Sequence, residues 1–524
     1  MKNWFNYLLL PLLAASCAGT DLDLPEAGRD AEGNPIYHEM IVLGSQLEDP
    51  YSVENMTKAL ASVYPTKAER VVIPATHHYV RFLPADDGQF HQLEQLGVQL
   101  MDHPVDYEIL REGDYYHDPA VSEDHITWQY AVLPADAQLP AGIRCEMLDE
   151  CFIPDAAPVS KSDGVDWEAV EREAFRLTGN ADLLAESGTK AGESGTPKGR
   201  ITILDSAFGV PEGVRGVKVS CNTFVKFDSA FTDKDGNYAM HRNFTSRPRY
   251  RLVFNNSCGF SIGFNLLLVP ASISTLGKNE ASGTDVLVDG NSDRKLYSRC
   301  AVNNAGYDYW QRCSADSPGI KTPPANLRLW LFQGLGGSCA AMLQQGVLLD
   351  GSALATLMGE YLTLLKIFLP DITLGLKGWS SYGDIYATAV HEFAHASHFM
   401  KAGKSYWNDF VLFVIKSYFT SGFVTYGVGT EENHGHCEVG EMWAYFMEAL
   451  LYRERYGDTG RTFGLNHWFH PQIFLQLEDR GLSCHKIFQV LDEEVTDRSI
   501  LQRKLISFYP EYKSEINQVF ARYN

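Results

Sequence analysis

The stretch from Ser381 to Met400, SYGDIYATAVHEFAHASHFM, constrains the fold of this chain more than any other. No Pro or Gly interrupts the chain from Asp384 to Ala402, which predicts one helix that is buried on most of its faces. His391 and His395 are four residues apart, so both side chains lie on nearly the same face of that helix. Two imidazoles buried without partners are costly, and a shared metal ion removes that cost. The alternative is a pair of histidines that are hydrogen-bonded within the core.

Glu392 completes the spacing His391-Glu392-Phe393-Ala394-His395, which is the HExxH motif of zinc hydrolases. It lies one step round the helix from His391, so its carboxylate can reach a water on the ion without being a ligand. The motif therefore predicts that His391 and His395 bind Zn²⁺. It also predicts that Glu392 takes a proton from water and later delivers it to the leaving amine.

A catalytic zinc site needs a third protein ligand and one open position. Metzincins supply a third His in the pattern HExxHxxGxxH. Here His398 stands where that pattern has Gly, and Lys401 stands where it has the third His, which excludes this class. The inverted order HxxEH is also absent from the chain.

A second run with helical character, CEVGEMWAYFME, extends from Cys437 to Glu448. Its opening resembles the second zinc-ligand helix of gluzincins, in which a Glu is followed three residues later by a small residue, as Glu441 is followed by Ala444. The resemblance implies a gluzincin-type zinc metallopeptidase in which Glu441 is the third ligand. Glu438, three residues earlier on the same face, remains an alternative ligand or an acceptor for a ligand histidine.

Residues 1–17 have the composition of a secretory signal, with Lys2, a short apolar run and small residues before Cys17. The apolar run is too short to span a membrane. The small residues ending in Cys17 resemble the lipobox of bacterial lipoproteins, although Leu13 is four positions before the cysteine instead of three. The resemblance implies export and a lipid anchor at Cys17 in the bacterial outer membrane, on the cell surface or the periplasmic face. Cleavage near Ala18 and free secretion is the alternative.

Composition agrees with an exported protein of several domains. The 524 residues predict about three domains, and residues 18–34 are polar and acidic, as in a flexible tether. The formal net charge of -22 argues against nucleic acid or an anionic membrane surface as a partner, because both attract basic patches. Ten cysteines are consistent with an oxidising compartment. Three local pairs are plausible disulfides: Cys145 with Cys151, Cys221 with Cys258, and Cys300 with Cys313.

The expected fold class is multi-domain α+β. Residues 35–154 mix short helices and strands, with a helix that begins at Ser52 and strands at 70–73 and 78–83, which predicts a small α+β domain. Residues 155–198 contain a helix at 166–177 followed by a Gly- and Ser-rich linker.

Residues 199–275 show short alternating strands, among them 217–220, 223–226 and 250–254. Between them, Thr232 to Tyr238 follows the pattern T-D-x-x-G-x-Y, which resembles the turn of transthyretin-like or carboxypeptidase-regulatory β-sandwiches. The resemblance implies a non-catalytic spacer or binding module. The acidic turn lacks the later ligands of an EF-hand, so a hairpin with Gly236 at positive φ is expected.

Residues 293–524 are expected to form a mostly helical, zincin-like catalytic domain. A strand is predicted at 327–332, and Pro370 indicates an edge or irregular strand at 367–374. The resemblance to gluzincins implies that residues 371–375 bind the substrate backbone as an added strand. A separate apolar helix is expected at 406–419.

The transition state needs a further donor for its oxyanion. Tyr426, His434 and His436 lie on the loop before Glu441 and are candidates for this role. His398 is expected to line the cleft or to cap the helix.

Two functions from different classes remain. The first is a zinc-dependent peptidase acting on extracellular or periplasmic proteins or peptides, and the intact Glu392 favours it. No GxMEN precedes the HExxH helix, so an endopeptidase is expected instead of an aminopeptidase of that type. The second is a lipid-anchored, non-catalytic binding protein that uses the zincin fold as a scaffold and the β-sandwich for its contacts.

Overall fold

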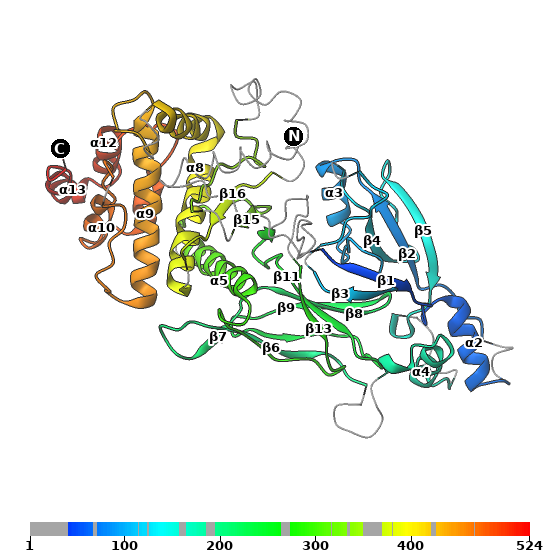
Figure 1. Ribbon diagram of the computed structural model, residues 1–524. Coiled ribbons are helices and arrows are strands. Elements are labelled where there is room, and N and C mark those ends of the chain that lie inside the picture. Colours follow the sequence, from blue (N-terminus) through cyan, green and yellow to red (C-terminus); the bar gives the residue numbers. More distant parts are fainter. Residues whose placement is uncertain are drawn as a thin grey trace, which may run out of the picture.

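The computed structural model describes residues 40–523, except 67–70, 114, 123–124, 157–163, 185–193, 264–272, 316, 333–335, 349–368, 380, 421–425 and 466. The predicted signal peptide with Cys17 and the predicted tether lie outside the described residues. The described part is a mixed α+β fold that contains several sheets. Most strands lie in the first two thirds of the chain, and the two longest described helices, α8 and α9, lie side by side in the last third (Figure 1).

The N-terminal part contains a three-stranded antiparallel sheet of order β4-β2-β5 and a ribbon that pairs β1 with β3. Its elements are β1 (Val42–Gln46), α2 (Val53–Val63), β2 (His77–Leu83), α3 (Asp87–Glu94), β3 (Tyr107–Arg111), β4 (Gln129–Pro134), β5 (Arg144–Cys151), η1 (Pro154–Ala156), α4 (Trp167–Leu177) and η3 (Ala181–Leu183). As predicted, α2 begins after Ser52, whose side chain accepts a hydrogen bond from the backbone of Asn55. The strand predicted at 70–73 is wrong for residues 71–73, which have no regular structure.

Two four-stranded sheets form the middle of the chain, one of order β10-β6-β14 with β7 paired to β6, the other of order β13-β11-β8-β9. Their strands are β6 (Lys198–Leu204), β7 (Pro211–Gly213), β8 (Lys218–Thr223), β9 (Lys226–Phe231), β10 (Asn237–Ala239), β11 (Arg249–Val253), β13 (Ile273–Lys278) and β14 (Val286–Val288). Ile201 of the first sheet and Val219 and Leu252 of the second are fully buried in one core cluster. The two sheets therefore share a hydrophobic core.

Of two predictions that concern turns of these sheets, one is confirmed and one is wrong. Gly236 has φ of 84° in the β9–β10 turn, where the Asp233 side chain accepts from the backbone of Asp235 at 2.8 Å, as the predicted hairpin requires. The strand predicted at 223–226 is wrong: Thr223 ends β8, Lys226 begins β9, and residues 224–225 form the turn between them. Phe224 in this turn packs against Phe175 of α4. The apolar side chain is therefore explained by a contact with the N-terminal part and does not indicate a strand.

The C-terminal part has a parallel sheet of order β12-β15-β16 and long helices. Its elements are β12 (Ser261–Gly263), α5 (Arg294–Ser314), β15 (Arg328–Phe332), β16 (Ile372–Gly375), α8 (Tyr382–Thr420), α9 (His434–Tyr456), α10 (Gln472–Glu478), α11 (Cys484–Gln489), α12 (Arg498–Phe508), η4 (Pro510–Tyr512) and α13 (Lys513–Phe520). The strand predicted at 327–332 is confirmed. The helix predicted at 406–419 is the second half of α8, which kinks at Gly403 with φ of 83°. Among the described helices, none is long and apolar enough to cross a membrane.

The middle sheets and the helical part form one packed unit. β12 lies between β11 and β13 in the chain, but it pairs with β15 of the helical part. β14, the last strand before α5, pairs in parallel with β6 of the middle part. One buried cluster of apolar residues continues from these sheets through α5, α8 and α9. At the end of α9, Arg455 lies 2.9 Å from Asp205 and 2.6 Å from Glu212, both in the middle part. These contacts fix the helices that carry the candidate site.

The local disulfides that the sequence suggested are wrong, because the nine cysteines between Cys145 and Cys484 are all free. Cys145 and Cys151 lie six residues apart on β5, which separates them by about 20 Å at 3.3 Å per residue. Cys300 and Cys313 lie on α5, where thirteen residues at 1.5 Å each also span about 20 Å. Both distances exceed what a disulfide can bridge, which is about 7 Å between Cα atoms.

Candidate metal centre

The first helix of the site, α8, is positioned by its start and by its buried face. The Ser381 side chain accepts from the backbone of Asp384 at 3.1 Å and donates to its carboxylate at 2.6 Å, which satisfies the first turn. Phe393, inside the HExxH motif, packs its ring between those of Phe260, Tyr309 and Trp310. This aromatic cluster holds one face of α8 in the core.

The second helix, α9, approaches α8 closely. Ala444 is fully buried, and Trp443 beside it donates from its indole nitrogen to the carbonyl oxygen of Ala394 at 3.2 Å. That bond joins α9 to the middle of the HExxH motif. The small side chain of Ala444 and the adjacent indole bond bring Glu441, one turn earlier, to the histidine pair.

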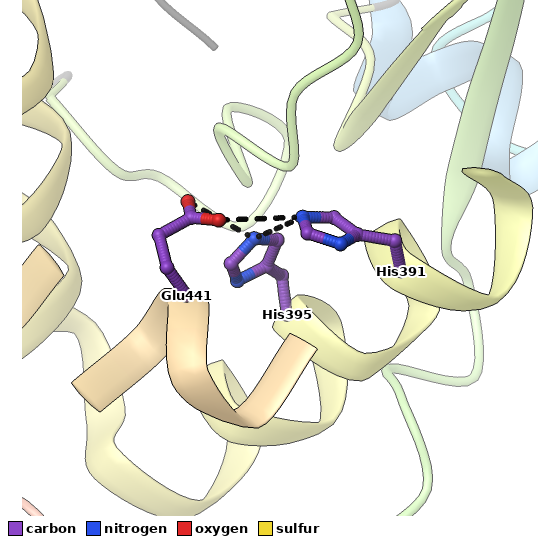
Figure 2. Close-up of side chains that lie close together, drawn as sticks. All are labelled: His391, His395 and Glu441. Atoms are coloured by element: carbon purple, nitrogen blue, oxygen red, sulfur yellow. Dashed lines mark hydrogen bonds and ion pairs between the residues drawn. The ribbon is translucent and has the colours of Figure 1, made fainter. Parts of the chain in front are cut away.

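Figure 2 shows His391, His395 and Glu441 pointing toward one another from the two helices. The Nε2 atoms of His391 and His395 are 3.1 Å apart. The Glu441 carboxylate places one oxygen 3.4 Å from His391 Nε2 and the other 3.4 Å from His395 Nε2. The exposed fractions of the three residues are only 8%, 3% and 1%. The structure therefore brings the three predicted ligands to one buried point.

The spacing of these atoms fits zinc. In a tetrahedral site with bonds of about 2.0–2.2 Å, neighbouring ligand atoms are about 3.3–3.5 Å apart. The observed separations of 3.1, 3.4 and 3.4 Å are close to that range. Among the described residues, neither carboxylate oxygen of Glu441 accepts a hydrogen bond, although both are buried. A bound cation would satisfy both oxygens. A pair of histidines hydrogen-bonded within the core would leave the Glu441 oxygens without a hydrogen bond.

Glu448, two turns after Glu441 on α9, was not identified from the sequence as part of the site. Its carboxylate accepts a hydrogen bond from His391 Nδ1 at 3.0 Å, and both side chains are about nine-tenths buried. This contact turns the other nitrogen, Nε2, toward Glu441 and fixes the orientation of the ring. His395 Nδ1 has no such partner within the described part of the chain. The two histidines are therefore held unequally.

The charges of the site shift its pKa values strongly. Burial alone would raise the pKa of Glu441, but the adjacent imidazoles of His395 and His391 lower it to about 2. Burial alone would lower the pKa of His391, but Glu441 and Glu448 raise it well above its ordinary value. The pKa of His395 is lowered, chiefly by burial. Glu441 is therefore ionised at neutral pH, which a ligand carboxylate must be.

Glu392 lies between the two histidines in sequence and is 4% exposed. Its Oε2 atom is buried and has no hydrogen-bond partner among the described residues. The pKa of its carboxyl group is raised to about 8, chiefly by burial; His391 lowers it, and the nearby carboxylates of Glu441 and Glu448 add to the increase. The motif therefore contains an unpaired acid group, which is available for proton transfer.

The rival ligand Glu438 is placed elsewhere. Its carboxylate lies 3.4 Å from the Arg498 side chain on α12 and does not belong to the group of atoms that meet at the histidine pair. His398 also stays apart from that group, although it follows His395 by three residues. It is fully buried against the rings of Tyr406 and Trp407, so the predictions that it lines a cleft or caps the helix are wrong.

Two rings near the site were not singled out from the sequence: Tyr445, which lies beside His391, and His467, which contacts Tyr445. Tyr445, one turn after Glu441, has its ring centroid 4.4 Å from that of His391. His467, in the segment after α9, lies 6.0 Å from Tyr445 by ring centroid, and its pKa is lowered chiefly by burial but also responds to Glu441 and His391. A spacing of four residues from Glu441 could have indicated Tyr445. Nothing local in the sequence indicates His467.

The three loop candidates differ in their surroundings. Tyr426 packs its ring 5.1 Å from that of His467 and so lies at the margin of the site. His434 donates from Nδ1 to the carbonyl oxygen of Glu431 at 2.7 Å, and His436 packs against Tyr406. Among the three, Tyr426 is the one in ring contact with His467.

The edge of β16 that was expected to receive substrate is already paired. Cys339 and Thr373 exchange two backbone hydrogen bonds at 2.9 and 2.8 Å, and Met342 donates to the carbonyl oxygen of Asp371 at 2.9 Å. The Asp371 side chain also accepts from the backbone of Gln345 at 3.1 Å. The prediction that residues 371–375 bind the substrate backbone as an added strand is therefore wrong, because residues 339–345 already occupy that edge.

Comparisons with known proteins add little to this geometry. The chain matches no protein-family model and no curated protein. Among solved structures, a chain described as the crystal structure of (S)-allantoin synthase matches at 15% identity and a TM-score of 0.14, over 25% of this chain and 50% of that chain. The alignment thus spans half the length of that protein. A similarity this weak carries no argument about fold or activity.

Proposed function

We propose that this protein is a zinc-dependent peptidase, by default an endopeptidase, that hydrolyses peptide bonds of extracellular or periplasmic proteins. One observation carries the proposal. The ligand atoms of His391, His395 and Glu441 meet at separations suited to zinc. Beside them, Glu392 is buried, its Oε2 atom has no hydrogen-bond partner among the described residues, and its pKa is raised to about 8. This is the donor set of a hydrolytic zinc site together with its general base.

Each residue of the chain has a distinct part in this proposal. His391, His395 and Glu441 would hold zinc, which supplies Lewis-acid chemistry that polarises a carbonyl and acidifies water. Glu392 takes the proton from the attacking water and passes it to the leaving amine. Glu448 keeps His391 Nε2 directed at the site by accepting from its Nδ1.

Tyr445 and His467 are the residues to which we assign stabilisation of the oxyanion. The Tyr445 ring lies beside His391 and the His467 ring contacts Tyr445, whereas His434 and His436 bind or pack elsewhere. Removing one such donor commonly lowers kcat by about 100- to 1,000-fold. His467→Ala should therefore reduce turnover while leaving zinc content unchanged, and loss of zinc in that variant would contradict the assignment.

The finer fold assignments belong to the same proposal. The two sheets with a common core and the Asp233–Gly236 turn support a transthyretin-like β-sandwich. The packing of α8 against α9 around the three ligands supports a zincin-like, gluzincin-type catalytic part. We also propose a lipid anchor at Cys17, which a Cys17→Ser variant tests by loss of radiolabelled fatty acid and release from the outer membrane.

Zinc content and cleavage of a broad peptide library test the proposal together. The zinc-loaded wild type should cleave peptides, and Glu392→Gln should keep stoichiometric zinc but lose cleavage by at least about 100-fold. Glu438→Gln is a matched control on α9 and should change neither property. If the zinc-loaded wild type cleaves no peptide, the proposal fails in favour of a lipid-anchored binding protein.

A further inference from the structure

A second group of potential ligands lies in the N-terminal part, where β5 meets the segment before α2. Asp149 and Cys151 are two residues apart on β5, so they share one face of the strand. Asp49 comes from the adjacent segment, which is joined to the end of β5 by a bridge between Ser52 and Cys151. One ligand atom from each of Asp49, Asp149 and Cys151 lies within 4.8 Å of the others.

An irregularity in the sheet directs Asp149 to this point. Tyr79 of β2 is opposite Asp149, but the next residue, Val80, is opposite Met147, so Leu148 is an extra residue in β5. Such a bulge changes the direction in which neighbouring side chains point. Beyond this bulge, Asp149 and Cys151 stay in register opposite Tyr79 and His77, and the Asp149 carboxylate lies near that of Asp49 at the end of the sheet.

Asp49 is the observation that points to a ligand. Its side chain is 9% exposed, and Oδ1 accepts from the backbone of Tyr51 at 2.8 Å. Its other oxygen, Oδ2, is buried and has no hydrogen-bond partner among the described residues. Neighbouring polar groups do not relieve it: Asp106 accepts from Gln46 and Tyr79, and the described partner of the Arg81 guanidinium is Glu146.

Two of the three residues line a cleft. Asp49 and Asp149 line a cleft of about 650 Å³, which is shared with Ser52, Asn55 and Tyr79. Four further acidic residues line the same cleft: Glu48, Glu54, Asp106 and Asp118. This excess of negative charge attracts cations from solvent. Cys151, which is fully buried, supplies the sulfur atom of the group.

We propose that Asp49, Asp149 and Cys151 form a second metal site, which binds a divalent ion of the zinc class. One sulfur and two carboxylates suit zinc or cobalt, whereas calcium takes six to eight oxygen ligands and has no use for a thiol. Binding replaces the thiol proton of Cys151, which passes to solvent, and satisfies Asp49 Oδ2. The ion pins the segment before α2 to the end of β5. This site is independent of the one between α8 and α9.

Cobalt titration of the full chain, stripped of metal by a chelator, tests the site. A cobalt ion held by Cys151 gives a thiolate charge-transfer band, whereas the donors at α8 and α9 are two imidazoles and a carboxylate. The wild type should bind two equivalents and show the band. Glu441→Gln should bind one equivalent and keep the full band, which separates this site from the proposed catalytic one. Cys145→Ser, on the same strand but outside the ligand group, should behave as the wild type.

Two variants in the Glu441→Gln background decide the outcome. Cys151→Ser should lose the band, and Asp149→Asn should weaken binding of the remaining equivalent by at least about 100-fold, the upper figure for a residue that only orients a ligand. Asp149 is partly exposed, so its variant keeps the test valid if Cys151→Ser fails to fold. A missing band in the Glu441→Gln protein, or unchanged cobalt affinity in its Asp149→Asn derivative, would overturn the proposal.

Discussion

Replacing Glu448 should weaken zinc binding even though this residue is not among the three proposed ligands. Its carboxylate accepts from His391 Nδ1 at 3.0 Å in surroundings that leave the two side chains 9% and 10% exposed. A hydrogen bond to a charged group contributes about 1.5–3 kcal/mol, and a neutral one about 0.5–1.5 kcal/mol. Glu448→Gln keeps an acceptor but removes the charge, so it should cost about 1–1.5 kcal/mol, or roughly tenfold in zinc affinity.

Glu448→Ala should cost more, because it leaves the Nδ1–H group of His391 buried without a partner. Loss of a residue that orients a metal ligand weakens affinity by about 10- to 100-fold, and the burial of this pair places the alanine variant near the upper figure. Competition with a chromophoric chelator of known zinc affinity measures all variants at one pH. The expected order of affinity is wild type, then Gln, then Ala.

Glu438→Gln is the matched control for this series. Glu438 lies on the same helix and is 6% exposed, but it contacts Arg498 instead of a proposed ligand. Its variant should bind zinc as the wild type does, whatever it costs in stability. The reasoning is refuted if the two Glu448 variants retain wild-type zinc affinity while folded, or if Glu438→Gln loses as much affinity as they do.

Three further predictions concern stability. Gly440→Ala should stabilise the protein by about 0.5–1 kcal/mol, because a Cβ inside α9 would meet only ordinary contacts at 3.7 and 3.8 Å. Gly435→Ala should destabilise it, because its Cβ would collide with the carbonyl oxygen of Thr496. The melting temperature should therefore rise for the first variant and fall for the second. Burial raises the pKa of Asp371 to about 6 from 3.8, so folding favours its protonated form and stability should fall as pH rises from about 4 to above 6, by up to about 3 kcal/mol. Urea denaturation of Asp371→Asn should lack that decline, and an identical pH profile would contradict the assignment. Arg455→Met should cost about 3–5 kcal/mol, because it leaves the buried Asp205 without its cation and Glu212 with only Arg215. An unchanged melting temperature would show that these contacts with the middle part do not stabilise α9.

Elements with strong local signals were predictable from the sequence. The caps at Ser52 and Asp166 satisfy the first backbone groups of α2 and α4, and Asp233 organises the β9–β10 turn through its own side chain. Each of these signals acts within four residues, so no tertiary contact is needed to interpret it. The boundaries of such elements follow from local chemistry.

Long-range pairings were not predictable in the same way. β12 joins β15, and residues 339–342 cover β16, although nothing in the local pattern of either segment names its partner. The segment at 223–226 shows the opposite problem, because its apolar residues resemble a strand but pack as a turn against α4. In both cases tertiary packing decides what the local pattern leaves open.

The candidate site divides along the same line. His391 and His395 share a face because one helix carries them, so a five-residue motif was enough to place them together. Glu441 required the resemblance to another helix, and Glu448 could have been inferred from its position two turns further along the same face. His467 reaches the site from the segment after α9, and only the folded chain reveals it.

The surroundings of Glu392 bear on the choice between an enzyme and a scaffold. The buried Oε2 atom of Glu392 has no hydrogen-bond partner in the described part of the chain, which costs stability, and an apolar residue of similar size would remove that cost. A protein that used these helices only to present a binding surface would have no physical use for such a group. A hydrolase does, because burial brings the pKa of Glu392 to about 8 and makes proton transfer near neutral pH possible in both directions. The cost of Glu392 is therefore better explained by chemistry at the histidine pair than by the architecture around it.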